Sequence, residues 1–201
     1  MVLLLVGIVG ACSTTVTLPS TPPNPTPSLS GSPMAFLSRD AGIAFSVPGG
    51  WTVTETNIVL HYEDVLAYLG TGSGQMVCNS DYIPGAGGTC AAHLYVPDNG
   101  IEVEVAEWSG PSLLQEPVDV ALATDPLASP ATVAGMPAAV HDGGGFIEGA
   151  TRGIKWTIAK PGEPWASFVL TANLKGPETS LSLAALSQII TSIWFPSPAP
   201  T

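Results

Sequence analysis

Ile101-Glu102-Val103-Glu104-Val105-Ala106-Glu107-Trp108 is the most regular stretch of this 201-residue chain. Its apolar side chains alternate with glutamates, which is the period of a β-strand with one face buried and the other toward water. The preceding Asn99-Gly100 supplies the positive φ angles of a tight turn, so we expect a β-hairpin with residues 93–96. The stretch therefore predicts an antiparallel sheet whose glutamates mostly face solvent.

Strand-like runs continue on both sides of this stretch. Residues 43–47 end at the turn Pro48-Gly49-Gly50, residues 58–69 fit one extended strand, and further runs cover residues 132–140, 152–159 and 165–174. Near the end of the chain apolar residues recur at spacings of three and four, which predicts a helix over residues 178–193. A helix across a mostly antiparallel sheet is an α+β architecture.

The start of the chain has the pattern of an export signal. An apolar run from Val2 to Val9 is much shorter than the roughly 20 residues that span a bilayer. It leads into Val9-Gly10-Ala11-Cys12, which resembles the lipobox of bacterial lipoproteins. The resemblance implies cleavage before Cys12, lipid on its thiol and amine, and a protein anchored at the extracytoplasmic face of the cell membrane without a transmembrane helix. The usual basic residues of such a signal are absent, since none precedes Arg39.

Composition divides the chain into four segments. Residues 1–11 form the expected signal peptide, and residues 12–35 form a linker rich in Ser, Thr and Pro without charged side chains. Such a segment cannot bury enough apolar surface to fold, and extended at about 3.1 Å per residue it reaches up to roughly 70 Å. Residues 36–195 form one α+β domain, and residues 196–201 a disordered tail.

The net charge excludes one class of partner. The formal charge is −11 at pH 7, and all of it lies in the domain. Because binding to phosphate backbones needs clustered Lys and Arg, we expect no nucleic acid as a partner.

Two cysteines remain besides Cys12. In an extracytoplasmic protein Cys78 and Cys90 are most simply a disulfide that closes a Gly-rich loop. The alternative makes Cys78, Cys90 and His93 zinc ligands, with Asp81 as a fourth, but their spacing does not match the short paired patterns of structural zinc sites. We expect the disulfide, and no metal or cofactor.

Three short motifs resemble PsbP-like domains. Residues 45–51 (Phe-Ser-Val-Pro-Gly-Gly-Trp) look like the opening of such a domain, residues 133–138 like its mid-domain strand, and residues 189–195 like its closing helix and strand. The resemblance implies an α-β-α sandwich, a central antiparallel sheet with helices on both faces. The same fold occurs in the photosystem II extrinsic protein, in a nuclear import factor that binds Ran, and in bacterial envelope lipoproteins. They dock onto partners and share no reaction, so the resemblance assigns no functional residues here.

Candidate chemistry is sparse. Gly70-Thr71-Gly72-Ser73-Gly74 misses the nucleophile elbow by one position. The local groups formed by His61, Glu63 and Asp64 and by His141 and Asp142 are the remaining candidates for a metal or acid-base site. Five tryptophans fit core and edge packing better than a groove for sugars or apolar ligands.

Two functions follow from these observations. We expect a noncatalytic binding or interaction module that is held at the membrane through Cys12 and takes a protein, apolar or glycan ligand of the envelope. The alternative is an envelope hydrolase or metal-dependent enzyme, which requires those His, Glu and Asp residues to converge in one pocket.

Overall fold

The computed structural model describes residues 31–60, 63–78, 90–95, 98–109, 117–176 and 180–196. Within these ranges the backbone alone is described for residues 57–60, 63, 73–78, 90–95 and 180. The lipobox with Cys12, together with His61 and Asp81, lies outside the described residues.

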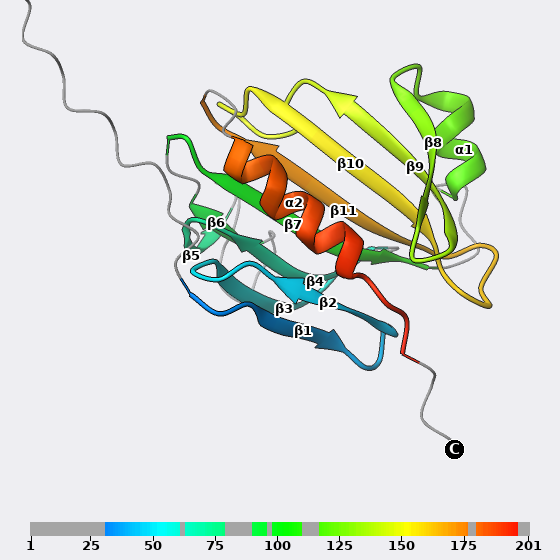
Figure 1. The fold of residues 1–201 in the computed structure, drawn as a ribbon, viewed down its shortest axis with the longest axis horizontal. Helices are drawn as coiled ribbons and strands as arrows, with labels where there is room; N and C mark the ends of the chain where they lie inside the picture. The colour runs from blue at the N-terminus through cyan, green and yellow to red at the C-terminus, as the bar shows by residue number, and fades with distance from the viewer. Residues whose placement is uncertain are drawn as a thin grey trace, which may run out of the picture.

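A seven-stranded antiparallel sheet forms the centre of the molecule, with strand order β3-β4-β7-β11-β10-β9-β8 (Figure 1). Its strands are β3 (Thr52–Leu60), β4 (Glu63–Gly70), β7 (Ile101–Trp108), β8 (Ala128–Val133), β9 (Met136–Gly143), β10 (Arg152–Ala159) and β11 (Ser167–Leu174). Two separate hairpins join β1 (Met34–Ser38) to β2 (Ile43–Val47) and β5 (Ser73–Cys78) to β6 (Cys90–Tyr95). The helices are α1 (Val118–Thr124) and α2 (Ser180–Ser192). The mostly antiparallel α+β class is thus confirmed.

The main core lies on one face of this sheet, which we call the inner face. Alternating apolar residues of β7 and β11, among them Val103 and Leu170, pack there against α2 and the β1–β2 hairpin. Helix α2 contributes Leu186 and Ile189 to the core, and Ile193 follows directly after the helix. Leu183 and Ile190, which belong to the predicted helical period, pack against this core. A backbone bridge between Ala44 and Trp194 ties the end of the chain to β2.

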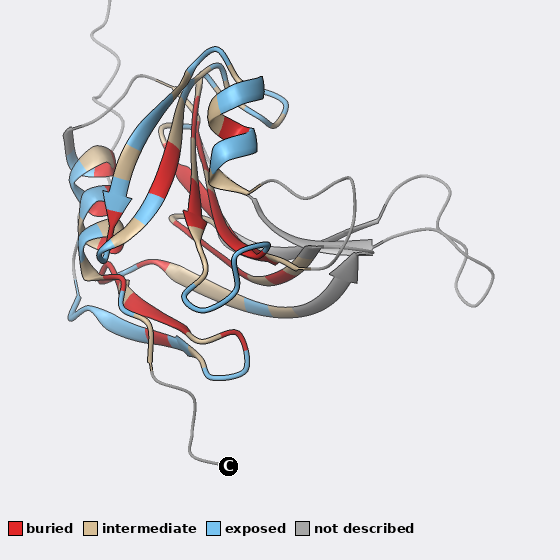
Figure 2. Cartoon of the chain, turned by 90° about the vertical axis from the view of Figure 1, so that its right-hand side faces the viewer, coloured by how far each residue is buried: buried red, intermediate tan, exposed pale blue. Residues whose placement is uncertain are grey.

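Helix α1 lies on the opposite, outer face of the sheet (Figure 2), where it contacts β8, β9 and β10. The sequence did not predict this helix. The helix has only seven residues, which is too short for an amphipathic period to be recognised in the sequence. Two of its residues are valines, whose helix propensity is low. Its burial rests on Ala121.

The predicted exposure of the β7 glutamates is wrong. Glu102 is only 3 % exposed and Glu107 only 8 %, while Glu104 is partly buried. Strand β7 lies between β4 and β11, so both of its edges are paired, and its side chains on both faces are buried or partly buried. Glu107 in addition shares the inner face with Val105, because the two positions differ by two residues along the strand.

The predicted hairpin across residues 97–100 is also wrong. Asn99 does have a positive φ of 64°, but β6 pairs with β5, whereas β7 pairs with β4 and β11. Residues expected to form single strands instead contain hairpins, because residues 58–69 are divided between β3 and β4, and residues 132–140 between β8 and β9. Alternation alone identified the strands without identifying their partners.

The ends of the sheets differ in how they are protected. At one end of the large sheet β8 carries Pro130, which has no N–H to offer to a further strand. Strand β1 pairs only with β2, and no described strand pairs with its outer edge. In Figure 1 β1 lies at the border of the molecule.

Neither helix, within the described part of the chain, has the length and apolarity that crossing a membrane requires.

Candidate functional site

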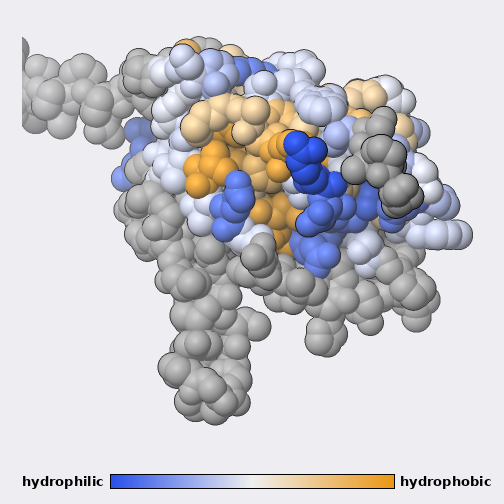
Figure 3. All heavy atoms as spheres, turned by 90° about the horizontal axis from the view of Figure 1, so that it is seen from below, coloured by the Kyte–Doolittle hydropathy of each residue, from blue (hydrophilic) through white to orange (hydrophobic). Residues whose placement is uncertain are grey.

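A cavity of about 400 Å³ lies between the β1–β2 hairpin and the inner face of the sheet. It falls in the 300–1,000 Å³ range typical of ligand sites. Its lining combines apolar and charged residues from four parts of the chain: Phe36, Leu37, Ser38, Arg39, Asp40, Ala41, Glu55, Thr56, Asp64, Leu66 and Glu107. Figure 3 views the molecule from this side and shows an apolar patch beside a band of strongly hydrophilic residues.

Irregularities in two neighbouring strands shape the sheet wall of this cavity. The register of β3 against β4 shifts between Glu55 and Ile58, and that of β4 against β7 shifts between Val65 and Ala67. Leu66 is therefore the extra residue of β4. The hydroxyl of Thr56 donates a hydrogen bond to the carbonyl of Val65 across this irregularity. Bulges of this kind redirect side chains and are frequent beside binding sites.

The roof of the cavity is the β1–β2 turn. The N–H of Gly42 donates to the carbonyl of Ser38 at 3.0 Å, and Gly42 has a φ of 78°, which favours glycine. This turn directs residues 39–41 over the sheet. Arg39 is the one basic residue among the described lining residues, against four carboxyl groups.

One of those carboxyl groups is fixed by an ion-pair network. The Nζ of Lys160 lies 2.6 Å from Oε1 of Glu107 and 2.8 Å from Oε1 of Glu163. Burial disfavours the charged ammonium, but the hydrogen bonds to Glu107 and Glu163 outweigh it and raise the pKa of Lys160. Lys160 therefore neutralises Glu107, which leaves Asp40, Glu55 and Asp64 as the carboxyl groups that set the charge of the cavity.

A second polar feature crosses the outer face of the sheet. The registers place Tyr68, Glu104, Thr171, Lys155 and His141 in one row across five strands. Burial raises the pKa of Glu104, and a hydrogen bond from Tyr68 lowers it in part. This row is a partly buried polar layer, in which Tyr68 is buried and the other four residues are intermediate in exposure. Helix α1 contacts the strands at one end of it.

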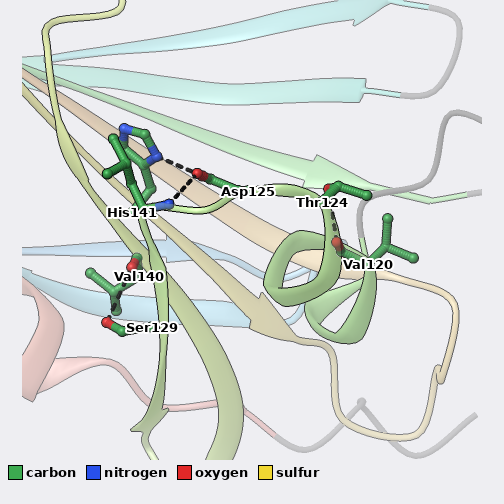
Figure 4. Close-up of polar contacts among 7 residues, drawn as sticks. Val120, Thr124, Asp125, Ser129, Val140 and His141 are labelled. Carbon is green, nitrogen blue, oxygen red and sulfur yellow. Dashed lines mark hydrogen bonds and ion pairs between the residues drawn. The ribbon is translucent and has the colours of Figure 1, made fainter.

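His141 at the end of this row is paired with Asp125, which follows α1 (Figure 4). Its Nδ1 lies 2.5 Å from Oδ2 of Asp125, whose other oxygen accepts the N–H of Leu127 at 2.9 Å. The Leu127 hydrogen bond and the histidine outweigh desolvation and lower the pKa of Asp125. The contact attaches the end of α1 to β9.

The sequence grouped His141 with Asp142, and the structure separates them. Neighbouring residues of a strand point to opposite faces, so Asp142 lies on the side away from His141 and forms an ion pair with Arg152. That pair lowers the pKa of Asp142. Sequence reasoning missed Asp125, which is 16 positions away from its partner.

The described members of the proposed hydrolase set do not converge. Asp64 lines the cavity on β4, whereas His141 lies on β9, four strand spacings or roughly 19 Å away. The side chain of Glu63 is not described, and His61 lies outside the described residues. Among the described residues no group of three or more His, Cys, Asp or Glu is arranged to hold a metal ion.

The register of the β5–β6 hairpin pairs Cys78 directly with Cys90. Facing residues of antiparallel strands have Cα atoms about 4.5–5.5 Å apart, a separation that a disulfide spans. His93 lies opposite Gln75 on the same hairpin, and its side chain is not described. The backbone thus brings Cys78 and Cys90 close enough together for the expected disulfide.

The tryptophans do not assemble into a groove. Trp51 belongs to the core and Trp156 packs against it, while Trp165 and Trp194 are 68 % and 54 % exposed at separate places. Trp165 lies in the β10–β11 turn, and Trp194 follows α2.

A comparison with models of known protein families finds no match. No curated protein sequence matches the chain significantly.

Proposed function

We propose that this chain is a lipid-anchored, extracytoplasmic binding module with a PsbP-like α-β-α sandwich fold, and that its ligand occupies the cavity beneath the β1–β2 hairpin. The single observation that carries the proposal is this cavity, because its volume is that of a ligand site and its wall is shaped by two bulges. The lipobox resemblance at Cys12 supports the anchor. The register of Cys78 and Cys90 suits an oxidising compartment.

A noncatalytic role fits the chemistry of the cavity. Its described lining residues include no His or Cys, and its hydroxyl groups, Ser38 and Thr56, have no described histidine beside them. The carboxyl groups and apolar side chains instead provide contacts of the kind that recognise a ligand. The proposed activity is therefore recognition in the cell envelope.

Binding is tested by filling the cavity. Leu66→Trp places an indole in it, and Leu127→Trp is the matched control, because Leu127 is exposed at a distant site. We expect a component of the envelope fraction to be retained by the native chain and by Leu127→Trp but lost with Leu66→Trp. Glu55→Trp is a second filling variant should Leu66→Trp unfold. Equal retention by every folded variant would remove the cavity as the binding site.

The anchor is tested separately by intact-mass analysis of the mature protein in membranes. We expect cleavage before Cys12 and two or three acyl chains, with release into the soluble fraction for Cys12→Ala. Recovery of an uncleaved, unacylated chain would refute the anchor without affecting the binding test.

A further inference from the structure

The cavity opens beside a strand edge that no described strand covers. Phe36, Leu37 and Ser38 line the cavity and belong to β1, whose outer edge has no described partner strand. Unpaired strand edges are templates for another extended chain, and natural proteins normally protect them with charges, proline or a covering segment. The described β1 sequence, Met-Ala-Phe-Leu-Ser, carries neither charge nor proline.

The side chains along β1 add to this exposure. Met34 is 46 % exposed and Leu37 is 42 % exposed, on opposite sides of the strand. Because residues alternate along a strand, a chain added at this edge would place its own side chains over both. Strand addition of this kind obtains affinity from backbone hydrogen bonds and specificity from pockets for alternate side chains.

The charge of the cavity selects the side chain that enters it. With Glu107 held by Lys160, the lining contains Asp40, Glu55 and Asp64 against Arg39. Phe36 and Leu66 add apolar surface to the same cavity. A lysine or arginine has the complementary composition, since its aliphatic stem covers apolar surface while its charged end reaches carboxylates.

We propose that an extended basic segment of a partner polypeptide adds as a strand to the outer edge of β1 and inserts one Lys or Arg side chain into the cavity. This inference rests on the proposed binding function and names the ligand class. A free amine would satisfy the carboxyl groups alone and would leave the edge and the apolar side chains of β1 uncovered. A polypeptide satisfies both.

The experiment uses the purified full chain and fluorescent nine-residue peptide pools with blocked ends. Flanking positions vary among Val, Thr, Leu and Ser, and the central residue is Lys, norleucine or Glu. We expect anisotropy to show the Lys pool binding at least about tenfold more tightly than the norleucine pool, since a charge-assisted hydrogen bond is worth that ratio or more. The Glu pool should bind least, and added salt should weaken the Lys pool selectively.

Two further tests separate the ionic contact in the cavity from the backbone pairing with β1. Asp64→Asn should weaken the Lys pool several-fold and leave the norleucine pool unchanged, while Glu148→Gln, an exposed carboxyl in another loop, should alter neither. N-methylation of alternate backbone amides in the Lys pool should abolish binding if the segment pairs with β1. Circular dichroism confirms that each variant is folded.

Each contrary result has a definite meaning. Equal binding of the Lys and norleucine pools would overturn the cationic ligand, and the Leu66→Trp test would still stand for the cavity. Full competition by cadaverine at the same concentration as peptide would assign the site to free amines. Binding that survives N-methylation would overturn strand addition, and no binding by any pool would overturn the whole inference.

Discussion

The Nζ of Lys160 lies 2.6 Å from Oε1 of Glu107, so that the turn between β10 and β11 is fastened to the wall of the cavity on β7. Both side chains are mostly buried, with 14 % and 11 % of their surface exposed. A pair of this kind fixes a carboxyl group in place. It also makes the cavity wall depend on a residue 53 positions along the chain.

Removal of one partner of this pair should destabilise the protein. Lys160→Met leaves Glu107 charged and buried without its cation, which costs roughly 3 kcal/mol in comparable pairs. The free energy of unfolding in urea at pH 7 measures the loss. Glu163→Gln is the control, because Glu163 is half exposed and should cost less than about 1 kcal/mol. Equal losses for the two variants would contradict this account.

The pair of Asp125 and His141 should make stability depend on pH. Since the folded state lowers the pKa of Asp125, its ionised form stabilises the fold above the ordinary carboxyl pKa, and this contribution is lost as the pH falls through the folded-state value. Asp125→Asn should therefore lower the melting temperature at pH 7, and its difference from the native chain should shrink at acid pH. Glu148→Gln is the control. A constant difference from pH 7 to pH 2 would refute the lowered pKa of Asp125, which the hydrogen bond from Leu127 and the contact with His141 produce.

Ionisation of Glu104 should have the opposite effect on stability to ionisation of Asp125. Because burial raises its pKa in the folded state, its ionised form destabilises the fold once the pH exceeds the carboxyl's unfolded value. Glu104→Gln, which can still accept the hydrogen bond from Tyr68, should raise the melting temperature at pH 7 and have little effect below pH 4. Tyr68→Phe should raise the pKa of Glu104 further, as carbon-13 titration of the carboxyl would show. A lowered melting temperature for Glu104→Gln at pH 7 would contradict the burial argument.

The facing positions of Cys78 and Cys90 predict that a disulfide forms between them under oxidising conditions. Nonreducing peptide mapping should recover the two cysteines in one linked fragment. Reduction, or the double change Cys78→Ser and Cys90→Ser, should cost roughly 3 kcal/mol in the chain-entropy description of a loop of this size. Alkylation of both thiols in the unreduced native protein would show that the bridge does not form.

Much of the secondary structure follows from the sequence, and the pairing of its strands does not. The period of Leu183, Leu186, Ile190 and Ile193 is enough to predict α2, because apolar residues at this spacing mark the buried face of a helix without reference to any other element. Alternation in β7 predicts a strand equally well. It cannot say that β7 is an interior strand, since that depends on β4 and β11, which come from distant parts of the chain.

The candidate site was beyond sequence reasoning for the same reason. Its charged residues come from the β1–β2 turn, from β3, from β4 and from β7, and apart from Arg39 and Asp40 no two of them are neighbours in the sequence. Alternation predicts that Glu107 is one more solvent-facing glutamate of the strand. Only Lys160, supplied by another hairpin, shows that it is a fixed part of a cavity wall. His141 and Asp142 show the reverse error, in which sequence neighbours are directed apart by the pleat.

Pro130 in β8 has a consequence for the size of any complex. A chain that accepted strands at both ends of its sheets would polymerise, with each copy recruiting the next. Here the β8 border lacks one backbone donor at Pro130, while the outer edge of β1 has no described partner strand. Pro130 therefore disfavours strand addition at the β8 end of the large sheet, so we do not expect a fibre to grow through that end.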